Sequence, residues 1–103
     1  APAPAADRRQ QKRDEAAARQ RLADARKPLA AKQAALEREM AALTSEKDAL
    51  DAWLASPDAY TDDARDALKD KVARQGELTW QLARLETEWL EIAEAIERLA
   101  GSP

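Results

Sequence analysis

In two stretches of the chain, residues that are mostly apolar recur alternately three and four positions apart, and this spacing constrains the fold more than any other feature. The first series is Leu29, Gln33, Leu36, Met40, Leu43, Lys47, Leu50 and Leu54. The second series is Ala64, Leu68, Lys71, Gln75, Leu78, Leu82, Leu85, Trp89, Ile92, Ile96 and Leu99. An α-helix brings positions at this spacing to one side, where they pack against a second helix. The pattern therefore predicts two long helices joined along one seam.

Composition points to the same fold class. The chain has 103 residues, of which 45 % are hydrophobic, but 26 residues are alanine and only one is valine. A β-sheet needs β-branched and aromatic residues, and only 4 % of this chain is aromatic. Ala, Glu, Asp, Lys, Arg and Leu dominate instead, as in long helices and coiled coils. We therefore expect an all-α chain.

The short stretch between the two series predicts an antiparallel hairpin. Ser56 and Pro57 are suited to a cap followed by a first turn, and Asp62 and Asp63 to the negative start of the second helix. Pro28 lacks an N–H and clashes with the preceding turn, so we expect a kink or break there, with a shorter helix before it. The predicted parts are a flexible linker (1–7), a coiled-coil hairpin domain (8–100) made of a first segment (about 8–27), a helix (about 28–55), a loop (56–62) and a helix (about 63–100), and a tail (101–103).

Two registers of the hairpin satisfy the heptads. The preferred one centres the turn on Ala59 and pairs Leu29 with Trp89, Leu36 with Leu82, Leu43 with Gln75 and Leu54 with Ala64. Its weak layer sets Lys47 against Lys71. A slip of one heptad removes that contact but makes the second helix overhang the turn.

Charge is distributed unevenly along the chain. Residues 1–38 hold 10 Lys or Arg and 5 Asp or Glu, whereas residues 39–103 hold 7 and 15, for a net charge of −3. Such a basic segment is suited to contacts with phosphate groups of DNA or RNA. The candidate contact residues are Arg8, Arg9, Lys12, Arg13, Arg19 and Arg26. In the alternative interpretation, the glutamates of the second helix (Glu86, Glu88, Glu91, Glu94 and Glu97) lie beside this segment and neutralise it.

One tryptophan lies off the seam. Trp80 is at a position that points away from the partner helix, so it is a candidate contact for another molecule. Alternatively, its ring leans back over Gly76, one turn earlier, where no side chain obstructs it.

Several kinds of chemistry are absent from the sequence. Without Cys or His there is no zinc site of the usual kind and no thiol or imidazole catalysis, and no Gly-rich phosphate loop is present. We therefore expect no catalytic residue, metal or cofactor in this chain. No apolar run approaches 18 residues and no leader is visible, so we expect a cytoplasmic chain without membrane contact. Because the one seam of each helix is satisfied within the chain, we expect the isolated piece to be mostly monomeric. The missing initiator Met suggests a piece of a larger protein.

Several strings resemble the C-terminal coiled-coil domain of ABC-F ATPases, with Uup-like and YheS-like proteins nearest. They are the lead-in RRQQKRDEAAARQRL (8–22), LEREMAAL (36–43), the loop LASPDAY (54–60) and EWLEIAE (88–94). Pro57, Asp58 and Tyr60 match the family's Pro-Asp-aromatic loop, whereas Ala59 stands where the family often has a larger residue. The resemblance covers roughly residues 8–99.

The resemblance implies a soluble parent protein with two nucleotide-binding domains, whose ATP and Mg sites and two Walker A motifs would lie upstream of this chain. Many ABC-F proteins act on ribosomes, and the C-terminal domain of Uup-like members is thought to bind DNA. We therefore expect a non-catalytic arm that contacts DNA or ribosomal RNA through its basic segment. The alternative is a structural spacer or protein-docking coiled coil without nucleic-acid contact.

Overall fold

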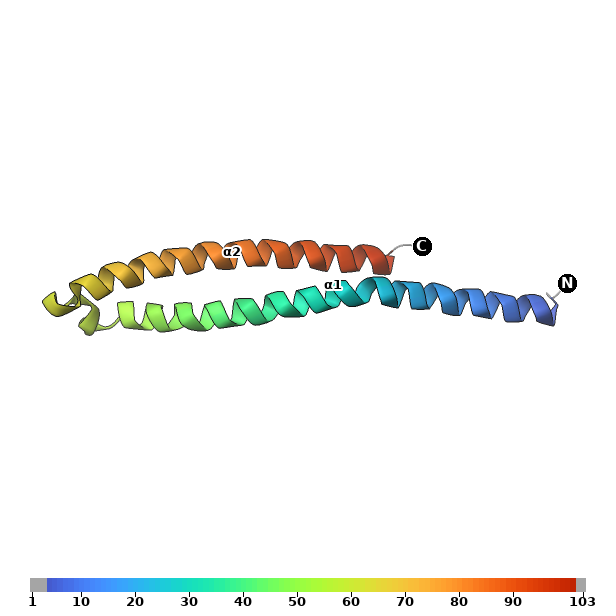
Figure 1. Ribbon diagram of the computed structural model, residues 1–103, viewed down its shortest axis with the longest axis horizontal. Helices are drawn as coiled ribbons and strands as arrows, with labels where there is room; N and C mark the ends of the chain where they lie inside the picture. The colour runs from blue at the N-terminus through green and yellow to red at the C-terminus, as the bar shows by residue number, and fades with distance from the viewer. Residues whose placement is uncertain (1–3, 102–103) are drawn as a thin grey trace.

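The computed structural model describes residues 4–101 and is a long antiparallel hairpin of two α-helices (Figure 1). Helix α1 spans Ala5–Leu54 and helix α2 spans Arg65–Gly101. Two short 3-10 turns, η1 (Pro57–Tyr60) and η2 (Asp62–Ala64), connect them at the tip. The molecule measures 88 × 17 × 15 Å. The all-α hairpin expected from the heptad spacing is confirmed.

The segment before Pro28 is not a separate helix, because α1 runs through Pro28 without interruption. Figure 1 shows a change of direction in the cyan stretch of α1, close to the point where it leaves α2. Pro28 has no N–H to donate to the carbonyl of Asp24, so a bend is the expected consequence of its place inside a helix. Of the two predicted outcomes, a break is not observed.

The helical part begins earlier than predicted. Residues 5–7, assigned to a linker, form the first turn of α1. The rest of the predicted linker lies mainly in residues 1–3, and most of the predicted tail in residues 102–103, which are outside the described residues.

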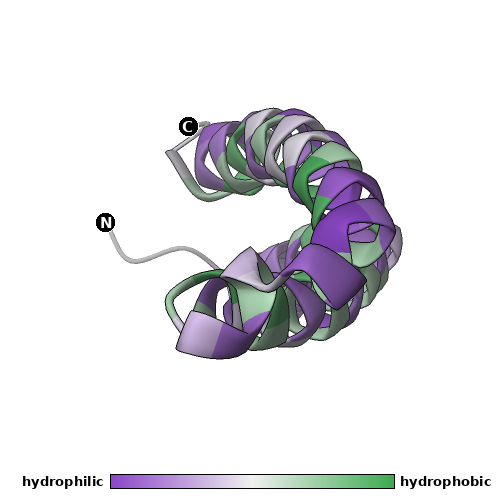
Figure 2. Cartoon of the chain, turned by 90° about the vertical axis from the view of Figure 1, so that its left-hand side faces the viewer, coloured by the Kyte–Doolittle hydropathy of each residue, from purple (hydrophilic) through white to green (hydrophobic). Residues whose placement is uncertain are grey.

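The predicted seam is the line of contact between the helices. Every position of the two heptad series is buried or half-buried. The four most buried of them are Leu36, Leu50, Leu78 and Leu85. Figure 2, viewed from the tip, shows hydrophilic residues mixed with hydrophobic ones along both helices, as expected for an arm with a single seam.

The hairpin adopts the slipped register, so the preferred register was wrong. The Trp89 indole Nε1 donates a 3.0 Å hydrogen bond to Glu37, the neighbour of Leu36. The Gln75 amide donates to Asp51, the neighbour of Leu50, in a second bond between the helices. In the preferred register Trp89 would face Leu29 and Gln75 would face Leu43, about one heptad away from these contacts.

The slip separates the two lysines that would otherwise meet. The Lys47 ammonium lies 2.8 Å from the Asp51 carboxylate on its own helix. The Lys71 ammonium lies over the Trp53 ring, 5.1 Å from its centroid. Each cation therefore gains an attractive partner in place of like-charge repulsion.

The tip closes over the part of α2 that overhangs α1. Figure 1 shows the start of α2 reaching beyond the end of α1 at this end. Turn η1 packs against both helices, and Ala59 in it is fully buried. The Tyr60 hydroxyl donates a 2.8 Å hydrogen bond to the carbonyl of Leu54. The Ser56 hydroxyl donates one of 2.6 Å to the carbonyl of Trp53 rather than capping η1.

The tip therefore accommodates only a small residue at position 59. A side chain at a fully buried position has no free space around it, so a larger residue would force the turn away from the helices.

A pair of double-cysteine variants tests the register. We expect Leu50→Cys with Gln75→Cys to form a disulfide under mild oxidation, because these positions face each other across the seam. The matched pair, Leu43→Cys with Gln75→Cys, is displaced by about 10 Å along the helix and should not close. Mobility on a non-reducing gel measures both. Efficient closure of the second pair and not the first would restore the unslipped register.

Introducing a charge into the seam should unfold the arm. Leu78→Asp buries an unpaired carboxylate where the leucine is fully buried, and should lower the free energy of unfolding by at least about 3 kcal/mol. Leu90→Asp is the control, because Leu90 is 49 % exposed on the same helix. Thermal melting followed by circular dichroism measures the difference, and equal melting temperatures would contradict the heptad assignment.

Candidate nucleic-acid interface

Helix α1 continues past the end of α2 as an unpaired helix. In the observed register Gly101, the last residue of α2, lies level with Asp24, and Figure 1 shows the blue end of α1 extending alone. We call residues 5–23 the overhang. At 1.5 Å per residue it is roughly 28 Å long. One side of this helix therefore has no neighbour in the described chain.

The overhang and its base carry all six predicted contact residues. Arg8, Arg9, Lys12, Arg13 and Arg19 lie on the overhang, and Arg26 lies just inside the hairpin; all six are exposed. Spacings of four and seven put Arg8, Lys12, Arg19 and Arg26 on one side of α1. Arg9 and Arg13 lie on the adjacent side. The structure thus groups the predicted residues into one elongated basic surface.

This basic stripe continues the seam. Counting back from Gln33 in steps of seven reaches Arg26, Arg19 and Lys12, and counting back from Leu29 reaches Leu22. From residue 8 to residue 26 the seam positions are therefore mainly cationic, with Glu15 and Leu22 as the exceptions. That the basic stripe shares one side of α1 with the seam was not predicted from the sequence.

The glutamates of α2 do not neutralise the overhang. Glu97, the last of the five, lies level with Pro28 in the observed register, and the other four lie nearer the tip. Among residues 4–101, no ion pair links these glutamates to Lys12, Arg19 or Arg26. These five glutamates therefore lie beside the paired part of α1, from Pro28 toward the tip, and not beside the overhang.

Carboxylates within the overhang and at its base are engaged mainly by glutamines. Gln10 donates to Asp14 at 2.8 Å, and Gln20 donates to Asp24 at 2.9 Å, each one turn away. Arg13 in turn donates to Gln10 at 2.9 Å. The overhang keeps a positive balance because residues 5–23 hold six Lys or Arg and three Asp or Glu, and hydrogen bonds from neutral amides leave that count unchanged.

Trp80 lies well away from the overhang, on α2. Its side chain is 66 % exposed, and the Arg84 guanidinium carbon is 5.4 Å from the ring centroid. Nothing lies within 4 Å of a Cβ placed on Gly76, so the ring does not lean over that glycine as the alternative interpretation expected. Contact of Trp80 with another molecule stays a prediction.

The perturbed ionisable groups lie in the middle of the hairpin rather than on the overhang. Arg74 donates to both carboxylate oxygens of Glu46, at 2.7 and 2.8 Å, and this lowers the pKa of Glu46 and raises that of Arg74. Hydrogen bonds from Lys47 and then Gln75 lower the pKa of Asp51. These bonds join or brace the two helices, and we assign them to the register rather than to catalysis.

The described part of the chain offers no cluster of acidic residues arranged to hold a metal ion. No helix within residues 4–101 combines the length and apolar character needed to cross a membrane. The chemistry available at the overhang is therefore that of exposed cations on a helix: attraction to a polyanion.

Comparison of the chain with protein-family models, with curated proteins and with solved structures finds no match.

The bonds of Asp51 predict an acid-sensitive contribution to stability. A lowered pKa in the folded state stabilises the fold above the ordinary value of 3.8, and this stabilisation is lost as the pH falls through the lower folded value. The melting temperature of the parent should therefore exceed that of Asp51→Asn at pH 7, and the gap should shrink as the pH falls below 3.8.

Asp70→Asn serves as the control, because Asp70 is an exposed carboxylate for which the structure shows no hydrogen bond or ion pair within residues 4–101. Its gap from the parent should be small and should change little with pH. A gap for Asp51→Asn that is the same at both ends of this pH range would refute the assignment.

Proposed function

We propose that this chain is a non-catalytic coiled-coil arm that contacts nucleic acid, either DNA or ribosomal RNA, through its basic overhang. The observation that carries the proposal is the unequal length of the helices. Because α2 ends level with Asp24 of α1, the cations of the overhang project beyond every acidic residue of α2. A helix that presents cations in a line along its length can contact several phosphates of a duplex.

The physics of the surface sets the expected mode of binding. Arginine and lysine contacts to phosphate release counterions, so affinity should fall steeply as salt is added. No aromatic residue lies on the overhang to stack on bases, so we expect little preference for sequence. At roughly 28 Å the overhang spans under one turn of a duplex, which limits the number of phosphates it reaches.

The resemblance to ABC-F C-terminal domains suggests where this arm belongs in a larger protein. In such a protein the arm extends from a pair of nucleotide-binding domains. These domains hydrolyse ATP and move the arm, and the arm itself catalyses nothing. The Pro57-Asp58 tip, the Trp89-Leu90-Glu91 string and the basic lead-in support the assignment. The tip that packs around Ala59 accounts physically for the small residue by which the loop departs from the family.

Charge reversal on the overhang tests the function. Replacing Arg8, Arg9, Lys12 and Arg13 by Glu should abolish binding to a short DNA duplex and to an RNA duplex of the same length at low ionic strength. These residues lie beyond the end of α2, so the hairpin should keep its melting temperature. Fluorescence anisotropy at several salt concentrations measures binding.

The matched control reverses four exposed cations elsewhere: Lys32, Arg65, Lys69 and Arg84. Both variants change the net charge equally, so only a local interface separates them. Binding retained by the control and lost by the overhang variant supports the proposal. Equal loss in both would reduce it to a general charge effect. A parent that binds neither duplex at low salt would favour the spacer or protein-docking alternative.

A further inference from the structure

A groove lies at the step where α2 ends against α1. It has a volume of about 440 Å³, and three larger apolar side chains line it: Leu22 from α1, and Ile96 and Leu99 from α2. Alanines 23, 30 and 100 make up the rest of the apolar lining. Leu22 is 44 % exposed, although it occupies a seam position. The groove thus lies at the end of the seam, where Leu22 is left partly uncovered.

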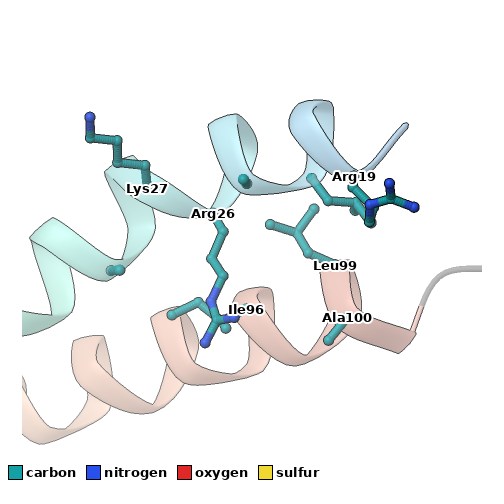
Figure 3. A pocket seen from close by; sticks show the side chains of 9 residues that line it. Arg19, Arg26, Lys27, Ile96, Leu99 and Ala100 are labelled. Atoms are coloured by element: carbon teal, nitrogen blue, oxygen red, sulfur yellow. The ribbon is translucent and has the colours of Figure 1, made fainter. Parts of the chain in front are cut away.

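Cations surround this apolar floor. Arg19, Arg26 and Lys27 line the groove, and no carboxylate among residues 4–101 does. Figure 3 shows Arg26 reaching from α1 toward Ile96, whereas Lys27 points away from α2 and Arg19 lies at the open end near Leu99. Long basic side chains commonly lay their stems along apolar surface while the charged head stays accessible. The groove therefore combines exposed leucine and isoleucine with positive charge only.

These two properties select the chemistry of an occupant. An apolar floor offers a phosphate neither a positive charge nor a hydrogen bond. The groove also has no aromatic ring on which a base could stack. A cationic partner would be repelled by the three basic side chains. An occupant that pairs carboxylates with Arg19 and Arg26 and buries a side chain against Leu22 satisfies both properties at once.

The path of α2 suggests the shape of the occupant. α2 covers the seam side of α1 up to about Asp24 and then ends, whereas the same side of α1 continues straight into Leu22 and Arg19. A third helix whose first turn lies beside the end of α2 would cover that continuing side at the usual spacing of a helix pair. Antiparallel to α1, its positions nearest Arg26, Leu22 and Arg19 would be separated by four and then three residues.

We propose that the groove is a docking site for an acidic amphipathic helix of a partner protein, with the pattern Glu-x-x-x-Leu-x-x-Glu. The leucine packs on Leu22 and Leu99, and the two glutamates meet Arg26 and Arg19. This inference does not depend on nucleic-acid binding, because its apolar half uses residues that play no part in that function. The two functions share Arg19 and Arg26, so an acidic helix and a nucleic acid would compete for them.

A labelled peptide tests the site. The probe is a blocked Ala/Gln helix of about 20 residues that carries the Glu-x-x-x-Leu-x-x-Glu pattern once, starting in its first turn, and its control has Lys in place of both Glu. Fluorescence anisotropy should detect binding of the acidic peptide, weakened by salt, and none of the lysine peptide. Leu22→Gln should weaken binding at least about fivefold, because the leucine of the peptide loses its apolar partner.

Two variants separate this site from the nucleic-acid surface. Leu90→Gln changes a leucine that is similarly exposed, at 49 %, but lies outside the groove, and should bind the peptide as the parent does. The variant with Arg8, Arg9, Lys12 and Arg13 changed to Glu should lose DNA and keep the peptide. Leu22→Gln should lose the peptide and keep DNA.

Three results would overturn the proposal. They are no binding of the acidic peptide by the folded parent at low salt, equal binding of the lysine peptide, and equal weakening by Leu22→Gln and Leu90→Gln. Sedimentation of the parent provides a further check: self-association that Leu22→Gln abolishes would make a second copy of the chain the occupant and would also refute the partner helix. Circular dichroism of each variant confirms that the hairpin is intact.

Discussion

The pairing of two helices along one narrow seam governs this molecule. A two-helix arm has no second layer to compensate for a poor contact, so each seam position counts. Only four leucines of the seam are nearly free of solvent contact. With so little apolar surface, charged and polar residues at the seam decide which register is stable. The bonds from Gln75 to Asp51 and from Trp89 to Glu37 occur only when the helices are slipped by one heptad from the arrangement centred on the turn.

The slip leaves part of one helix unpaired at each end of the hairpin. The two unpaired parts differ in whether the rest of the chain covers them. At the tip, the 3-10 turn η1 folds back onto α2 and buries Ala59, so the overhanging start of α2 is covered. At the base, the described chain provides no such cover. The overhang there carries cations at the seam positions, and these keep it from pairing with a basic or purely apolar helix. The open end is therefore the part of the arm suited to a partner, and an anionic one.

The sequence predicted the helices and the seam well, because heptad spacing survives any choice of register. Leu36, Leu50, Leu78 and Leu85 occupy seam positions in either arrangement. Register itself was not predictable from apolar spacing, since both arrangements pair equivalent positions. The distinguishing signals were polar: the aromatic ring of Trp53 available to Lys71, and the carboxylate of Asp51 available to Gln75. Their effect depends on the direction of each side chain, which the sequence does not contain.

The setting of the candidate residues was harder to predict than the helix that carries them. Arg8, Arg9, Lys12 and Arg13 lie beyond the end of α2. Whether the glutamates of α2 would reach the remaining cations depended on the register, so the sequence left that question open. The groove at Leu22 depends on where α2 stops relative to α1, and it could not be located before the register was known.

Pro28 lies close to the position where α1 parts from α2, and this gives the molecule a mechanical property. The paired part of α1 is held by α2, whereas the overhang is held only by its own backbone, which lacks one hydrogen bond at the proline. Bending is therefore concentrated near one point. An overhang of roughly 28 Å that pivots by about ten degrees moves its far end by about 5 Å. The arm can thus keep its tip fixed while its basic end adjusts to the curvature of whatever it touches.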